Sequence, residues 1–187
     1  MLEGESGEVQ DWCGSVQERF GVIPRMLPPV DWNNDLTPWP APPIFKKGKP
    51  FGGKADAYLA NLLRLEDEPA ERWFLGVSLA GLFGVWASAQ TPFFTKVAAI
   101  SGSFWYPGFV DWAKAQTFKA NAYYLSLGDR ESESKNPHLK GIADDTAAVL
   151  NVLESQGLPT TFEWTSGTHF GPLLPRLDMA LTALRKE

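Results

Sequence analysis

Two kinds of segment alternate along most of this sequence, from about residue 54 to its end. Apolar runs of about four to eight residues suit buried strands, whereas apolar residues three and four positions apart indicate helices with one buried face. Strands that alternate with helices form βαβ units, which build a mostly parallel sheet covered by helices on both faces. The alternation therefore predicts an α/β fold. The expected strands are residues 72–77, 96–101, 122–128 and 160–165, and the expected helices are residues 55–65, 78–90, 108–116, 138–157 and 173–184.

The N-terminal segment has a different composition, because the first fifty residues contain eight of the fifteen prolines and three of the eight tryptophans. Proline fixes φ and lacks a backbone donor, so a long regular helix is not expected here. A short strand over residues 25–31 is conceivable, but Pro28 and Pro29 would confine it to an edge or to one end of a sheet. The segment is either a loop over a pocket or a surface wrap anchored by its tryptophans.

The length and composition predict one domain. A chain of 187 residues has the size of a single domain, and 44% hydrophobic with 21% charged residues excludes wholesale disorder. We expect this domain to cover residues 1–187, with a segment rich in proline and tryptophan over residues 1–53 and a βα core over residues 54–187.

Charge and composition exclude several classes of function. A net charge of −5 argues against nucleic-acid binding, which needs a basic surface to neutralise phosphates. One cysteine and two histidines are too few for a Cys/His zinc site, so no metal is expected. The acidic, polar start does not have the pattern of a signal peptide, and no stretch approaches the ~18 uninterrupted apolar residues of a membrane span. We therefore expect a cytoplasmic protein that binds neither nucleic acid nor membranes.

Ser78 lies where the expected strand over residues 72–77 meets the next expected helix. A serine hydroxyl is a weak nucleophile and must be presented to a base. In a nucleophile elbow, a sharp strand-to-helix turn exposes the serine, and small residues two positions before and after it prevent clashes. Gly76 and Ala80 hold these positions, so the pattern is G-x-S-x-A rather than G-x-S-x-G. The alternative is that Ser78 caps the N-terminus of a buried helix.

A base and an orienting acid should follow the serine in the order acid, then histidine. His169 lies between the last expected strand and the last expected helix, in SGTHFGP, whereas His138 opens a helix and is expected to be solvated. Although a lone histidine is more often structural, only His169 has the required place and order. The acid should come from the loop after residues 122–128, where Glu131 is the first choice and Asp129 the second. It would fix the histidine tautomer and stabilise the imidazolium.

A second motif, G-x-x-x-x-G-K over residues 48–54, matches a phosphate-binding P-loop. Ala55 stands where serine or threonine must reach Mg²⁺, and no convincing strand precedes the motif. Pro50 also removes an N–H group that the phosphate cradle would use. Nucleotide binding is therefore rejected, and the glycines are expected to open the helix that begins near Ala55.

Several segments together resemble a group of bacterial esterases of the α/β-hydrolase superfamily, related to the siderophore esterases and to the esterase D and S-formylglutathione hydrolase branch. The resemblance implies the α/β-hydrolase fold without a large lid. Because such enzymes normally begin with additional strands, the first strands are expected to be reduced or absent behind this shortened N-terminus. The segments, spread over roughly residues 30–185, are DWNNDLTPWPAPPIF, PFGGKADAYL, GVSLAGLF, SGSFWYPGF, YLSLGDRESESKN and SGTHF.

The resemblance also implies the roles of the site residues. Ser78 would be the nucleophile, His169 the base and a carboxylate within residues 129–131 the acid, although some siderophore-esterase relatives work with a Ser–His dyad. The oxyanion hole would combine the N–H of Leu79 with an N–H near Trp32.

Two aromatic residues are assigned by the same resemblance. Trp105 and Tyr106 would line the substrate pocket, and the alternative is that they pack in the core or on the surface.

These observations predict a serine hydrolase that cleaves a small-molecule carboxylic ester through an acyl-enzyme, with no metal or organic cofactor. An acyltransferase with the same site is one alternative, since water and an alcohol compete for the same acyl-enzyme. A non-catalytic binding protein with the same fold is another. The oligomeric state stays open, and a homo-oligomer is one possibility because the tryptophans of the N-terminal segment could form an interface.

Overall fold

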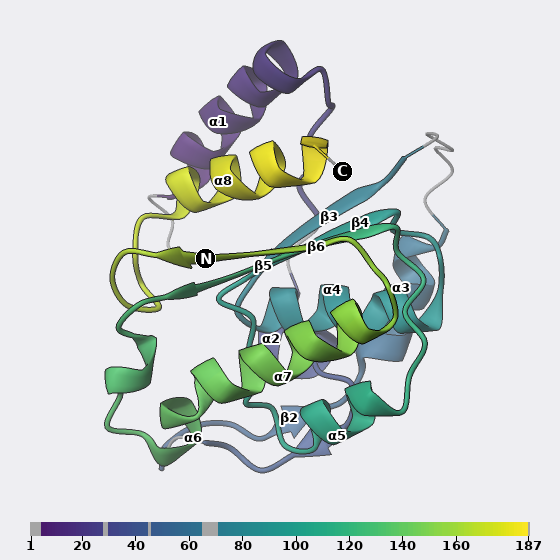
Figure 1. Cartoon of the computed structure of the whole chain (residues 1–187). Helices are drawn as coiled ribbons and strands as arrows, with labels where there is room; N and C mark the ends of the chain where they lie inside the picture. Colours follow the sequence, from purple (N-terminus) through teal and green to yellow (C-terminus); the bar gives the residue numbers. More distant parts are fainter. Residues whose placement is uncertain (1–4, 28–29, 45, 65–70, 187) are drawn as a thin grey trace.

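The computed structural model describes residues 5–27, 30–44, 46–64 and 71–186. In this part of the chain, four parallel strands form one sheet in the order β3-β4-β5-β6 (Figure 1). The prediction of a parallel α/β sheet is confirmed. The strands are β3 (Trp73–Val77), β4 (Lys96–Ile100), β5 (Ala122–Gly128) and β6 (Thr160–Thr165).

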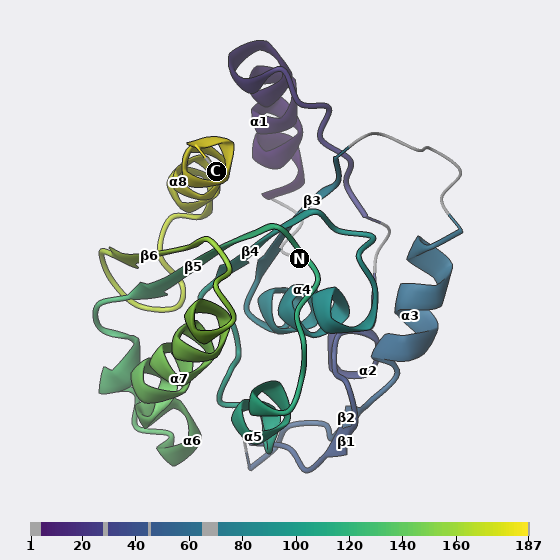
Figure 2. The same cartoon turned by 45° about the vertical axis from the view of Figure 1, so that its right-hand side comes forward.

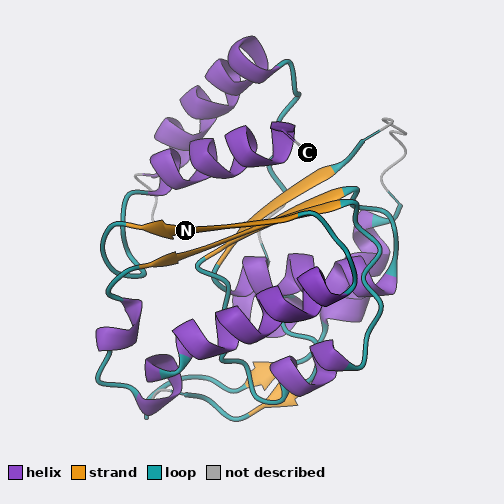
Figure 3. Cartoon of the chain, in the orientation of Figure 1, coloured by secondary structure: helices purple, strands orange, loops and turns teal. Residues whose placement is uncertain are grey.

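The helices form two layers, one on each face of the sheet (Figures 1 and 3). The spatial order of the strands follows the sequence, so right-handed crossovers place the connecting helices α4, α5 and α7 on the same face. Helices α1 and α8 cover the other face, as the turned view in Figure 2 also shows. The remaining elements are α1 (Glu5–Phe20), α2 (Trp32–Asp35), β1 (Pro40–Ala41), β2 (Phe51–Gly52), α3 (Ala55–Leu62), α4 (Leu79–Gln90), α5 (Phe109–Lys114), the 3₁₀ helix η1 (Glu131–Glu133), α6 (Pro137–Lys140), α7 (Ile142–Ser155) and α8 (Leu173–Lys186).

Two hydrophobic cores lie on opposite faces of the sheet, and β5 contributes to both. Tyr123 and Leu125 pack in the larger core under α4 and α7, whereas Tyr124 packs in the smaller core under α8. All seven residues of β5 are buried. Strands buried on both faces appear in a sequence as continuous apolar runs, which is the pattern that predicted them.

Helix α1 corrects the expectation that the first fifty residues contain no long helix. It covers Glu5–Phe20 and ends before the first proline, Pro24, so the prolines do not interrupt it. Trp12 Nε1 donates to Asp178 Oδ1 of α8 at 2.8 Å, and Val16 is 1% exposed. The prolines therefore exclude a long helix only from Pro24 onward.

The rest of the N-terminal segment wraps around the larger core. Trp39 contacts the rings of Tyr106, Phe109 and Trp112, and its Nε1 donates to the carbonyl of Pro107. These contacts favour the interpretation as a wrap anchored by tryptophan. The short strand considered over residues 25–31 includes positions 28 and 29, which lie outside the described residues, and the described positions around them form no strand.

Element boundaries otherwise differ from the predicted ones in small ways. The segment predicted as one helix over residues 138–157 is divided into α6 and α7 at Gly141. The Asn136 side chain accepts a hydrogen bond from the His138 N–H at 3.0 Å, and Pro137 is the first residue of α6. Leu65, the predicted end of the helix at residues 55–65, lies outside the described residues. No described helix is long and apolar enough to cross a bilayer.

Candidate active site

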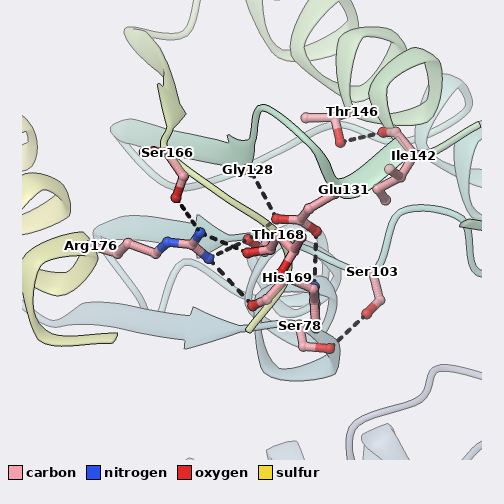
Figure 4. Close-up of polar contacts among 11 residues, drawn as sticks. Ser78, Ser103, Gly128, Glu131, Ile142, Thr146, Ser166, Thr168, His169 and Arg176 are labelled. Carbon is pink, nitrogen blue, oxygen red and sulfur yellow. Dashed lines mark hydrogen bonds and ion pairs between the residues drawn. The ribbon is translucent and has the colours of Figure 1, made fainter. Parts of the chain in front are cut away.

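The carboxyl ends of the parallel strands bring the candidate residues to one edge of the sheet. Ser78 follows β3, Ser101 follows β4, Glu131 follows β5, and the loop with His169 follows β6. Ligands of open α/β sheets bind outside this edge. Figure 4 shows the side chains of Ser78, Glu131 and His169 grouped together, with His169 between Glu131 and Ser78 in this view.

Ser78 stands on a sharp turn between β3 and α4. Its φ of 56° and ψ of −123° are unusual for a residue with a side chain, and such a conformation persists only where the surroundings hold it. The Ser78 N–H donates to the carbonyl of Ile100 at 3.0 Å, and its carbonyl accepts from Leu82 and Ser103 at 3.1 Å each. This is the geometry of a nucleophile elbow. No hydrogen bond from the Ser78 side chain caps α4, which disfavours the capping interpretation.

Gly76 explains why the turn needs a glycine before the serine. A Cβ atom at this position would lie 2.4 Å from the backbone carbon of Ala80, closer than any side chain tolerates. Ala80 is half-buried, so its own methyl group has room and the second glycine of G-x-S-x-G is not required here.

Glu131 pairs with His169. The distance from Glu131 Oε2 to His169 Nδ1 is 2.9 Å, and the Glu131 side chain is 4% exposed. Its other oxygen accepts from Ser101 Oγ at 2.5 Å and from the Gly128 N–H at 2.8 Å. Burial alone raises the pKa of Glu131, but these hydrogen bonds and the nearby His169 outweigh it, so the pKa lies below its ordinary value of 4.5. The carboxylate is therefore held in its charged form.

Asp129, the second choice for the acid, has a different position. It is exposed, and its Oδ1 accepts from the Gly167 N–H at 2.8 Å. The Arg130 N–H donates to the Gly167 carbonyl at 3.0 Å. Asp129 thus braces the loop that carries His169, and the carboxylate that reaches the imidazole in this structure is that of Glu131.

Ser78 and His169 are not hydrogen-bonded in this structure. The Ser78 hydroxyl instead lies 3.1 Å from that of Ser103 (Figure 4). Because Glu131 occupies Nδ1, His169 keeps Nε2 for a second partner. Catalytic hydrogen bonds are often long or misaligned before substrate binds, so this separation is compatible with a serine–histidine pair.

The two oxyanion-hole candidates occupy helix starts. Leu79 is the first residue of α4, where the N–H has no carbonyl partner within the helix. Trp32 is the first residue of α2, which packs against α4, and the residue is 40% exposed. No hydrogen bond among the described residues joins Trp32 to Ser78.

The aromatic candidates differ in exposure. Tyr106 is 1% exposed and its hydroxyl donates to the carbonyl of Trp39, so it lies in the core rather than on a pocket wall. Trp105 is half-buried against Phe51 and Tyr106. Phe170 was not singled out from the sequence. It is 93% exposed, and its ring lies edge-on to that of His169 with 5.3 Å between the ring centroids.

Three polar residues near the site were also missed. Ser101 and Ser103 follow β4 at the same edge of the sheet as Ser78. The reasoning that proposed Glu131, from its place just after a strand, would also have found them. Arg176 of α8 donates to the carbonyls of Thr168 and His169 at 2.9 and 3.4 Å. No motif marks this arginine in the sequence. No cluster of three or more His, Cys, Asp or Glu side chains in the described ranges could hold a metal ion.

Comparison with known proteins identifies the fold. An IroE-like serine hydrolase from Shewanella oneidensis superposes with a TM-score of 0.66 at 19% identity, over 81% of this chain and 56% of that one. The siderophore hydrolase EstA from Aspergillus nidulans superposes with a TM-score of 0.62 at 19% identity, over 95% and 77%. The chain has the fold of the α/β-hydrolases.

A curated relative is similar to part of this chain in sequence. The uncharacterized protein YbbA of Bacillus subtilis is 27% identical in an alignment of 145 residues, which covers 70% of this chain and 58% of YbbA. No model of a known protein family matches the chain. The chain thus spans little more than half the length of YbbA and of the Shewanella hydrolase.

Proposed function

We propose that this protein is a serine hydrolase that cleaves a small-molecule carboxylic ester through an acyl-enzyme. The observation that carries the proposal is the pairing of His169 with Glu131 at the sheet edge where Ser78 stands on its elbow. A nucleophile, a base and a carboxylate that orients the base are the parts that acyl transfer requires. Solved structures with this fold are described as a serine hydrolase and a siderophore hydrolase, which supports hydrolysis as the reaction class.

The mechanism follows from the positions of these groups. Ser78 Oγ attacks the ester carbonyl carbon while His169 Nε2 takes the hydroxyl proton. The tetrahedral intermediate collapses, and the leaving alcohol takes that proton from His169. Water then attacks the acyl-enzyme with the same histidine as base, which releases the acid and regenerates Ser78.

Charge develops at two points, and the chain has a group for each. The oxyanion would receive the N–H of Leu79 at the positive end of α4, where one such donor is worth about 10²–10³ in rate. The imidazolium would be stabilised by Glu131, whose low pKa keeps it ionised at neutral pH.

Hydrolysis of p-nitrophenyl acetate tests the proposal. Ser78→Ala should reduce turnover by at least about 10³-fold, because the variant lacks the oxygen on which the proposed acyl-enzyme forms. Ser155→Ala is the matched control, since this hydroxyl lies exposed at the end of α7, where it donates to the carbonyl of Val152. Product analysis with an added alcohol separates hydrolysis from acyl transfer. Undiminished turnover in folded Ser78→Ala would refute the assignment.

A further inference from the structure

One buried cation has no part in the mechanism above. Arg176 is 4% exposed, and no carboxylate in the described part of the chain forms an ion pair with it. Its guanidinium donates to the carbonyls of Ser166, Thr168 and His169 at 3.3, 2.9 and 3.4 Å. Burying an arginine without a counter-charge is costly, and here it is held by the loop that carries the base.

Ser101 connects this arginine to the carboxylate. Its Oγ lies 3.3 Å from Arg176 Nη1 and 2.5 Å from Glu131 Oε1, and the residue is 1% exposed. A guanidinium offers only donors, so the Ser101 oxygen accepts from Arg176. The single hydroxyl proton of Ser101 must then point to Glu131. The direction of this hydrogen bond is set by Arg176.

The next contacts in the chain are fixed in turn. Glu131 Oε1 receives two donors, the Ser101 hydroxyl and the Gly128 N–H, and is filled as an acceptor. Both donors favour the ionised carboxylate, and an ionised carboxylate can only accept from His169 through Oε2. The neutral imidazole therefore carries its proton on Nδ1, which leaves the lone pair on Nε2.

We propose that Arg176 and Ser101 are positioning residues, which hold Glu131 as an ionised acceptor and His169 in its Nδ1–H tautomer. This proposal rests on the proposed function, because the Nδ1–H tautomer matters only if His169 is the base for Ser78 and therefore needs an unprotonated Nε2. The backbone at Ser101 supports it, since its φ of 48° is rare for a residue with a side chain.

Nitrogen NMR of the histidine side chains tests the tautomer directly. The chain contains only two histidines, and exposed His138 serves as an internal reference. In the native protein, neutral His169 should be protonated on Nδ1. In Ser101→Gly, the His169 population should shift toward the Nε2–H tautomer that free histidine prefers in water, while His138 stays unchanged.

Two substitutions at Ser101 separate the hydroxyl from the backbone. Ser101→Ala and Ser101→Gly both remove the hydroxyl, but only glycine relieves the left-handed conformation. Both should lower kcat for p-nitrophenyl acetate by about 10- to 100-fold with KM unchanged, as expected for one lost hydrogen bond to a charged group. Ser101→Gly should unfold at a higher urea concentration than Ser101→Ala.

Substitution of Arg176 provides a second test of the proposal. Arg176→Met should lower kcat and shift the His169 tautomer in the same way, and Arg176→Lys should give intermediate values because lysine keeps the charge but not the planar fork. The native tautomer and native kcat in both folded Ser101→Gly and Arg176→Met would overturn the inference. The tautomer is measured without turnover, so this result is distinct from a failure of the Ser78 proposal.

Discussion

Asp129 and Glu131 are close neighbours in the sequence, yet their surroundings give them different roles. Glu131 accepts from His169, whereas Asp129 accepts from the loop backbone at Gly167. Glu131→Gln should lower kcat by about 10²–10⁴-fold, because the neutral amide cannot stabilise the imidazolium. Asp129→Asn should cost less than about tenfold, because its amide oxygen still accepts the Gly167 N–H. Steady-state kinetics of both variants measure these losses of kcat. A larger loss in Asp129→Asn than in Glu131→Gln would assign the acid to Asp129.

The low pKa of Glu131 also gives the fold a pH dependence. A carboxyl whose pKa is lower in the folded than in the unfolded state stabilises the protein above the unfolded value of about 4.5. This contribution is lost as the pH falls through the folded pKa. The free energy of unfolding of the native protein should therefore exceed that of Glu131→Gln by a constant amount above about pH 5 and by less at lower pH. Urea unfolding between about pH 3 and 7 measures the difference, and a difference independent of pH would contradict it.

At the scale of residues, strand ends carried most of the information in the sequence. Ser78, Glu131 and His169 could be proposed because each follows an apolar run, and such runs end at one edge of a parallel sheet. Arg176 could not be proposed from the sequence, since its contacts depend on how α8 packs against the loop before it. Tyr106 could not be assigned either, because aromatic residues favour cores and pockets alike.

Among the elements, the turn from β3 into α4 is closely packed at Gly76. Gly76→Ala should lower the free energy of unfolding by about 3 kcal/mol, since the added methyl group would meet the backbone of Ala80 at 2.4 Å. Gly14→Ala is the control, because this exposed glycine lies within α1 and a Cβ there would meet nothing within 4 Å. It should raise stability by about 0.5–1 kcal/mol. Equal effects of the two substitutions in chemical denaturation would refute this packing argument.

Most elements of the core could be predicted from periodicity, whereas α1 could not. The apolar runs of β4 and β5 are unambiguous because they are buried on both faces. Helix α1 has a polar composition and contacts the body mainly through Trp12, Val16 and Arg19. Such a helix owes its position to tertiary contacts with α8, which no local pattern reveals.

For the whole molecule, the two cores share β4 and β5, so they should unfold together. Leu153→Ala in the larger core and Leu184→Ala in the smaller core should each lower the free energy of unfolding by about 2–5 kcal/mol. Tryptophan fluorescence and far-ultraviolet circular dichroism should report one coincident transition in both variants. Loss of α8 in a separate, earlier transition of Leu184→Ala would show that the faces are independent.

Ser78 is tested most directly by the position of covalent labelling with a fluorophosphonate, which reacts with activated serines. Peptide mass spectrometry should find one adduct, on Ser78, and it should disappear in His169→Ala. An adduct on Ser103, whose hydroxyl lies 3.1 Å from that of Ser78, or the absence of any adduct on the folded protein would contradict the assignment of Ser78 as the activated nucleophile.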